Sequence, residues 1–333
     1  MRPAPVNRRP RRSRNKDERA LPEQRRKGPS PSSTMNLNIR HIVYPGADTP
    51  ISVIGIEAHW SLRKKSNGFC ISTWRRFIRR VAKDPNCYVV IVGDWIDADR
   101  PTTRERKLLM GMGRPEVLDE EEMEHQFFLK HNLIEDLLPI KDRIIGAVDG
   151  DHFKVYSDGT TSTQFILKEL GCPEAYLGQR MGWIRLVVNT AGRMRQGAPN
   201  GGGIAYHIFV RHGKGAAATP GADVNALLNQ STQFDADLHM AGHTHKQWFF
   251  KVPHLYCGKY DVKQRYVAYA RAGSLLRGFI YGQPTYAELA EYKPLSIGWP
   301  EIQLWFTRRS RRTATDPRQS GHNIELKDVR GIT

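Results

Sequence analysis

The stretch YVVIVGDWID, residues 88–97, decides the fold of this chain. Its first five residues are apolar and mostly β-branched, and the run ends at Gly93, before Asp94 and Asp97. A short β-branched run bounded by glycine and polar residues is typical of a buried strand. Because open α/β sheets bind ligands just beyond the carboxyl ends of their strands, this stretch predicts a strand that carries carboxylates to a site.

Four more apolar runs end in the same manner, each followed by acidic or histidine residues. They are residues 51–56 before Glu57-Ala58-His59, 144–148 before Asp149-Gly150-Asp151-His152, 205–210 before Arg211-His212-Gly213, and 238–241 before Gly242-His243-Thr244-His245. Mixed carboxylate and imidazole ligands suit Mn, Fe, Zn or Ni, whereas Ca prefers oxygen ligands alone. We therefore expect the five strand ends to converge on one metal centre.

The sequence between these runs predicts the remaining architecture. Apolar residues spaced three and four apart predict a helix over residues 71–82, and helices are also expected over 119–138, 160–170 and 221–230. Strand patterns cover residues 183–188, 236–241, 247–253, 264–271 and 301–306. Strands that first alternate with helices and then dominate predict an α/β domain with two sheets. The segments 98–117 and 191–203 are expected to be loops that shape access to the site.

Positive charge is concentrated at the two ends of the chain. Of the formal net charge of +17, residues 1–30 contribute +8 and residues 307–333 contribute +4. We therefore predict a disordered basic tail over residues 1–35, a folded domain over 36–306 and a basic C-terminal tail over 307–333. Such tails can bind DNA or RNA by neutralising phosphates, or they can be merely solvated.

Cysteine usage and hydropathy bear on the compartment. The four cysteines lack the close spacing of a zinc site or a disulfide framework, which favours reduced thiols and a cytoplasmic protein. No run reaches the 18 apolar residues of a membrane span, and no apolar stretch of a signal peptide follows the basic N-terminus. No membrane association is expected, and no pattern specifies an oligomeric state.

The ordered set of strand ends resembles the calcineurin-like metallophosphoesterase superfamily. That family's pattern is Asp-x-His, Gly-Asp-x-x-Asp, Gly-Asn-His-(Asp/Glu), a single His and Gly-His-x-His, which residues 50–306 match in order. Glu57 stands where the family usually has Asp, and Asp151 where it usually has Asn. The longer Glu57 is expected to shift or weaken one metal, and the added charge of Asp151 to tighten cation binding. The resemblance implies two packed mixed β-sheets flanked by helices, in a four-layer α/β/β/α sandwich.

The resemblance also implies a role for each motif residue. One divalent ion would be held by Glu57, His59, Asp94 and His245, and a second by Asp94, Asp151, His212 and His243. Asp94 would then bridge the two ions and count, with His152, among the catalytic residues. His152 would face the phosphate and stabilise the transition state or protonate the leaving oxygen. Asp97 would orient a ligand from behind.

Several other charged residues lie beside these motifs. Arg211, Lys214 and Lys246 flank predicted ligands and are candidates for phosphate contact, with solvated surface charge as the alternative. His207 and His239 lie inside strand patterns, so we expect them to be outside the site.

The predicted chemistry is phosphoester hydrolysis. Two divalent ions would neutralise the anionic ester and activate a bridging hydroxide as nucleophile, with Mn²⁺ preferred and Fe, Zn or Ni as alternatives. The basic ends favour a phosphodiester substrate such as nucleic acid. Alternatives are a phosphomonoesterase or nucleotidase, and a non-catalytic nucleic-acid-binding protein on the same scaffold.

Overall fold

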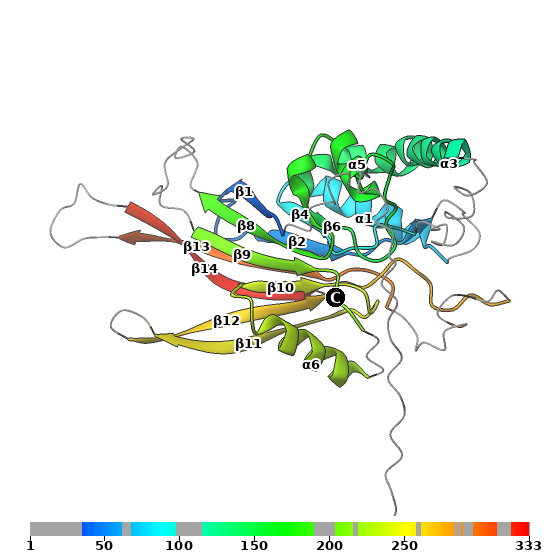
Figure 1. Ribbon diagram of the computed structural model, residues 1–333. Coiled ribbons are helices and arrows are strands. Elements are labelled where there is room, and N and C mark those ends of the chain that lie inside the picture. The colour runs from blue at the N-terminus through cyan, green and yellow to red at the C-terminus, as the bar shows by residue number, and fades with distance from the viewer. Residues whose placement is uncertain are drawn as a thin grey trace, which may run out of the picture. The chain divides into compact units, whose positions relative to one another are not determined.

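The strand of residues 87–91, β4 (Cys87–Ile91), lies within a six-stranded sheet, as Figure 1 shows for the computed structural model. The order is β14-β13-β2-β4-β6-β7, with β2 (Ile51–Ile56), β6 (Ile144–Val148), β7 (Tyr176–Gly178), β13 (Glu301–Arg311) and β14 (Gly321–Ile332). All residues of β2, β4 and β6 are buried, in agreement with their mainly apolar sequences. These three strands and β7 run parallel, so their carboxyl ends meet at one edge.

A second six-stranded sheet packs against the first. Its order is β1-β8-β9-β10-β12-β11, with β1 (Leu37–Val43), β8 (Met181–Asn189), β9 (Ile204–Arg211), β10 (Leu238–Ala241), β12 (Val262–Arg271) and β11 (Trp248–Cys257). β9, β10 and β12 run parallel, which places the residues after β9 and β10 at a common edge. The short β3 (Trp60–Ser61) and β5 (Ile96–Asp97) form a separate pair.

Helices cover the outer faces of both sheets. The first sheet carries α1 (Ile71–Lys83), α3 (Pro115–Phe128), the π-helix η1 (Leu129–Ile134), α4 (Glu135–Leu137), the 3-10 helix η2 (Leu138–Arg143), α5 (Ser162–Glu169) and the 3-10 helix η3 (Pro173–Ala175). α6 (Pro220–Ser231) lies over the second sheet. Separate apolar clusters fill the space under the first group of helices, between the sheets, and under α6. The predicted four-layer α/β/β/α arrangement is confirmed.

Residues 35–61, 68–97, 115–189, 204–215, 219–257, 261–282, 285, 288, 296–311 and 321–332 are the part of the chain that the structure describes. The predicted tail over 1–35, apart from residue 35, lies outside them, as do the predicted loop over 191–203 and most of the one over 98–117. Within the described residues, no helix combines the length and apolar character needed to cross a membrane.

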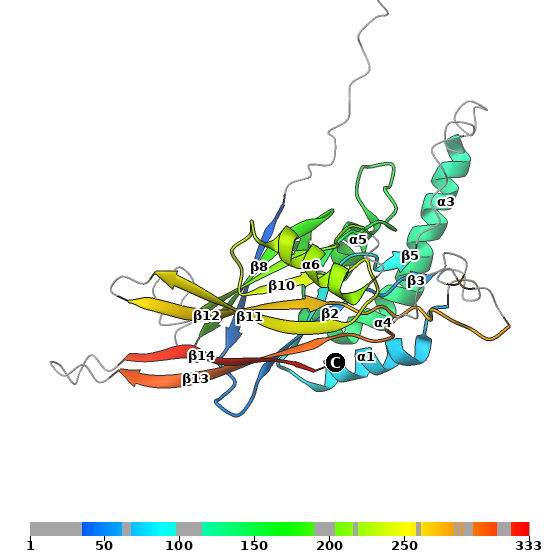
Figure 2. The same cartoon turned by 90° about the horizontal axis from the view of Figure 1, so that it is seen from below.

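The structure differs from the prediction of a C-terminal tail over residues 307–333, because part of this segment forms strands. β13 continues to Arg311 and pairs antiparallel with β14, from Glu301 opposite Ile332 to Arg311 opposite Gly321 (Figure 2). The sheet therefore extends well past residue 306. Charge content suggested a tail, but a strand ladder is formed by backbone groups, which any sequence other than proline supplies. β1 is a further strand that the apolar patterns did not predict; within it only Asn38 and Ile42 are buried.

Candidate metal centre

The predicted ligands lie in the turns that follow β2, β4, β6, β9 and β10. Four of these residues adopt a left-handed backbone, and they are the only non-glycine residues with positive φ in the described part of the chain. They are His59 (48°), Asp94 (43°), His243 (76°) and His245 (52°). A left-handed backbone conformation costs free energy in residues other than glycine, and such residues are concentrated at functional sites. The fold bends each strand end sharply to aim these side chains inward.

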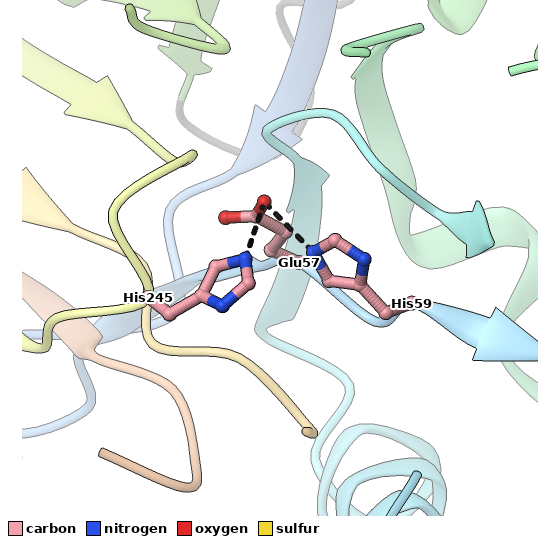
Figure 3. A group of neighbouring side chains, drawn as sticks. All are labelled: Glu57, His59 and His245. Carbon is pink, nitrogen blue, oxygen red and sulfur yellow. Dashed lines mark hydrogen bonds and ion pairs between the residues drawn. The ribbon is translucent and has the colours of Figure 1, made fainter. Parts of the chain in front are cut away.

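Glu57, His59 and His245 form one group of potential ligands (Figure 3). Oε1 of the fully buried Glu57 lies 3.1 Å from Nε2 of His59 and 3.4 Å from Nε2 of His245. Its Oε2 accepts a 2.7 Å hydrogen bond from the backbone N–H of His243. Burial opposes ionisation of Glu57, but His245 and then His59 outweigh it and hold the pKa of this carboxyl well below its usual range. Glu57 is therefore an ionised carboxylate in contact with both histidines of this group.

Asp151, His212 and His243 form a second group. Nε2 of His212 lies 3.2 Å from Oδ2 of Asp151 and 3.2 Å from Nδ1 of His243. On its other side, Nδ1 of His212 lies 3.1 Å from the carbonyl oxygen of Val92. When Nδ1 donates to that carbonyl, Nε2 presents a lone pair to the group, which is the tautomer that binds metals. Burial lowers the pKa of His212, but the hydrogen bond with Asp94 and the charge of Glu57 raise it to about 9, so this position attracts positive charge.

Asp94 lies between the two groups. Its buried Oδ2 is 3.2 Å from Nε2 of His212 and 3.8 Å from Nε2 of His59. Its Oδ1 accepts backbone N–H groups of Asp151, at 2.5 Å, and of His152, at 2.9 Å. Burial raises the pKa of Asp94, but the hydrogen bond with His212 and the charge of His59 lower it by more than burial raises it. The net shift is therefore downward. With Glu57 and His212, Asp94 forms a further group of potential ligands that overlaps the first two.

His152 lies on the open side of the site. Its Nδ1 is 2.9 Å from Oδ1 of Asp97, and its Nε2 is 4.0 Å from Oδ2 of Asp94. The hydrogen bond to Asp97 is the main cause that raises the pKa of His152 above its ordinary value. The side chain is 42% exposed, whereas that of Asp94 is 2% exposed. His152 is therefore partly exposed, and its contact with Asp97 fixes the orientation of its ring.

Two glycines allow the ligand loops to approach. A Cβ on Gly150, where φ is +86°, would lie 2.3 Å from Oδ1 of Asp94. A Cβ on Gly93, where φ is +110°, would lie 2.2 Å from Nδ1 of His212. Both motif glycines are needed because the ligand loops pack directly against them.

A buried ion pair behind the histidine loop was not predicted. Nη2 of Arg271 lies 2.9 Å from Oδ1 of Asp223 on α6, and both side chains are almost completely buried. Nη1 of Arg271 donates to the carbonyl of Gly242 at 2.5 Å, directly before His243. Oδ2 of Asp223 accepts from Trp248, at 2.8 Å, and from Thr244 at 3.4 Å. The pair thus fixes both ends of the loop that carries His243 and His245, and no sequence motif signals it.

Arg180 was also missed by the sequence reasoning. Its Nη2 lies 2.5 Å from Oδ1 of Asp151, so the added charge of Asp151 is met by a neighbouring cation. Burial raises the pKa of Asp151, and the hydrogen bond to Arg180 then brings it below the ordinary value. The expectation that the added charge of Asp151 tightens cation binding stays a prediction, and Arg180 offsets part of that charge.

The three predicted phosphate contacts have different surroundings. Val210 faces the core between the sheets, so Arg211 projects to the opposite face, where it lies near Arg271. Arg211 is buried, which lowers the pKa of its guanidinium to about 10, and its phosphate contact stays a prediction. Lys214 is exposed and Lys246 is half-buried.

His207 and His239 lie outside all four groups of potential metal ligands found among the described residues, as expected. His207 pairs with Asp237, and the buried His239 stacks on Tyr269.

No family model and no curated protein matches the chain. Among solved structures, wild-type Vps29 from Entamoeba histolytica complexed with Zn²⁺ is similar at 13% identity, with a TM-score of 0.35, over 83% of this chain and 98% of that chain. A conserved uncharacterized protein of Streptococcus pneumoniae TIGR4, a predicted phosphoesterase, is similar at 12% identity, with a TM-score of 0.28, over 83% of this chain and 99% of that chain. Identities and scores this low transfer no residue role to this chain, so the chemistry of the site rests on its own side chains.

Proposed function

We propose that this protein is a phosphoesterase that uses two divalent metal ions, with a phosphodiester as the preferred substrate. The observation that carries the proposal is the position of Asp94 between two groups of ligand atoms, 3.2 Å from His212 and 3.8 Å from His59. Glu57, His59 and His245 would hold one ion, and Asp151, His212 and His243 would hold the second. Asp94 would be a ligand of both. Mixed nitrogen and oxygen ligands favour Mn²⁺, Fe, Zn or Ni over Ca.

The donor set also fits the chemistry. Paired divalent ions supply charge neutralisation of a phosphate ester and an activated water nucleophile. The protein's part is to keep its ligand atoms unprotonated and aimed inward, which the lowered pKa values of Glu57, Asp94 and Asp151 favour. Two alternatives are tested below. The enzyme would hydrolyse a phosphomonoester or a nucleotide, or the protein would bind nucleic acid without catalysis.

His152 would supply the proton for the leaving oxygen. Asp97 accepts the Nδ1–H of the ring, which leaves Nε2 pointing toward the space beside Asp94. A raised pKa keeps a larger fraction of His152 protonated near neutral pH, as a general acid requires. His152 and Asp94 are therefore the proposed catalytic residues.

Hydrolysis of a chromogenic bis-aryl phosphodiester with added Mn²⁺ tests this proposal. Asp94→Asn should lower kcat/KM at least about a hundredfold, because the shared carboxylate positions both metals. Asp142→Asn removes an exposed carboxylate elsewhere and should leave the rate unchanged. Metal analysis should find about two equivalents in the wild-type protein and fewer in Asp94→Asn. Equal rates for the wild type and Asp94→Asn would end the catalytic proposal, and metal binding without turnover of any ester would favour the binding role.

The basic N-terminal segment suggests nucleic acid as the diester. Residues 1–30 carry a net charge of +8. Each phosphate neutralised releases counterions, so removing residues 1–30 should flatten the dependence of DNA or RNA affinity on salt concentration. Affinity measured across a salt series would check this, and an unchanged slope would assign the segment to solvation alone.

A further inference from the structure

The turn between β7 and β8 is held against two of the ligand loops. The backbone carbonyl of Arg180 accepts the N–H of His212 at 2.9 Å, and that of the preceding Gln179 accepts the N–H of Gly150 at 3.1 Å. Gly150 directly precedes Asp151. Because these bonds run to two separate strand ends, Arg180 has a defined position beside the proposed metal ligands.

The guanidinium of Arg180 is separated from the ligand atoms by a single carboxylate. Nη2 of Arg180 lies 2.5 Å from Oδ1 of Asp151, and Oδ2 of the same carboxylate lies 3.2 Å from both His212 and His243. An arginine this close adds a fixed positive charge where an anionic substrate would bind. An asparagine at position 151 would not attract the guanidinium in this way, since it carries no charge.

Arg180 also keeps donors available to a ligand. A guanidinium has five N–H donors, and within the described residues Asp151 is the only ion-pair or hydrogen-bond partner of this side chain. The side chain is 51% exposed. His152, Asp151 and His243 are likewise partly exposed, whereas Glu57, His59, Asp94 and His212 are buried. The site is thus open on the side where Arg180 and His152 lie.

We propose that Arg180 binds the substrate's phosphate and that Asp151 holds its guanidinium for this purpose. The proposal rests on the phosphoesterase function proposed above. Arginine recognises phosphate oxygens through paired, charge-assisted hydrogen bonds, and its planar fork adds geometric selectivity that a lysine lacks. Asp151 would then serve both as a metal ligand and as the anchor of a phosphate-binding arginine.

Two variants and their combination separate this role from simple charge compensation. Arg180→Gln should weaken binding of inorganic phosphate to the Mn²⁺-loaded protein about 10- to 100-fold and raise KM for the diester, the size expected for hydrogen bonds to a charged group. If Arg180 only offsets the charge of Asp151, the double variant Asp151→Asn/Arg180→Gln should regain wild-type phosphate affinity. If Arg180 binds phosphate, the double variant should remain as weak as Arg180→Gln.

Calorimetry with inorganic phosphate is the primary measurement, after the bound Mn²⁺ of each variant has been determined. Arg185→Gln removes an exposed arginine from β8 and should change neither phosphate affinity nor KM. The proposal would be overturned if the double variant bound phosphate with wild-type affinity. It would also be overturned if Arg180→Gln kept wild-type phosphate affinity or lost its bound metal. Phosphate binding that depends on Arg180 in a protein without esterase activity would support the phosphate site and refute the proposed hydrolysis. A metal-loaded wild type that binds no phosphate would overturn the inference itself.

Discussion

Replacing Asp223 by asparagine should weaken metal binding although Asp223 is not a predicted ligand. Asp223 pairs with Arg271, which in turn donates to the carbonyl of Gly242 at 2.5 Å. His243 and His245 follow within three residues. Asparagine has nearly the same shape as aspartate, but it leaves the charge of Arg271 buried without a counter-ion.

The size of the effect follows from burial. The side chains of Arg271 and Asp223 are 1% and 0% exposed, and removing one partner of a buried ion pair costs about 3–5 kcal/mol. At about 3 kcal/mol, the midpoint of thermal unfolding should fall by roughly 6–12 °C, since a large domain loses roughly 2–4 °C per kcal/mol. Residues that orient metal ligands typically affect metal affinity about 10- to 100-fold, and we expect a loss in that range.

Asp235→Asn is the matched control. Asp235 pairs with Arg265 at the surface, where its side chain is 81% exposed, and such pairs contribute about 0–1 kcal/mol. Differential scanning calorimetry without metal and Mn²⁺ titration of the folded protein measure the two effects separately. If Asp223→Asn matched Asp235→Asn in both measurements, the buried pair would not position the histidine loop, and the reasoning would be refuted.

Two other substitutions test the backbone of the site and the acid stability of the fold. Gly150→Ala should abolish most metal binding, because its methyl group would lie 2.3 Å from Oδ1 of Asp94; metal analysis checks this, and full occupancy would show that the loop can relax. Burial, and then the charge of Arg211, lower the pKa of His239 to about 4 from an ordinary value of 6.5. Between these pH values the unfolded chain binds a proton that the folded state does not, so stability falls as pH falls from about 6.5 to about 4. His239→Phe should flatten this slope by about 1.4 kcal/mol per pH unit in chemical denaturation, and an unchanged slope would contradict the buried neutral state of His239.

Much of the architecture could be predicted because its signals are local. The mainly apolar runs of β2, β4 and β6 are buried on both faces, and the helix predicted over residues 71–82 is α1. Helix and strand periodicities depend on residues only a few positions apart, so a single sequence carries them. β14 escaped prediction because its strand depends on pairing with β13, which the composition of a basic segment does not reveal.

The sequence by itself determined which side chains stand at the strand ends and that their types suit metal ions. Only the tertiary structure decided which of them meet: Glu57 accepts the backbone N–H of His243 across 186 positions, and Arg180 reaches Asp151 from a turn that carries no motif. It likewise buried Arg211 near Arg271, and it buried Asp223 with Arg271 behind the histidine loop. The physical reason is that strand order and sheet packing set distances between remote residues, whereas sequence spacing sets only those between neighbours.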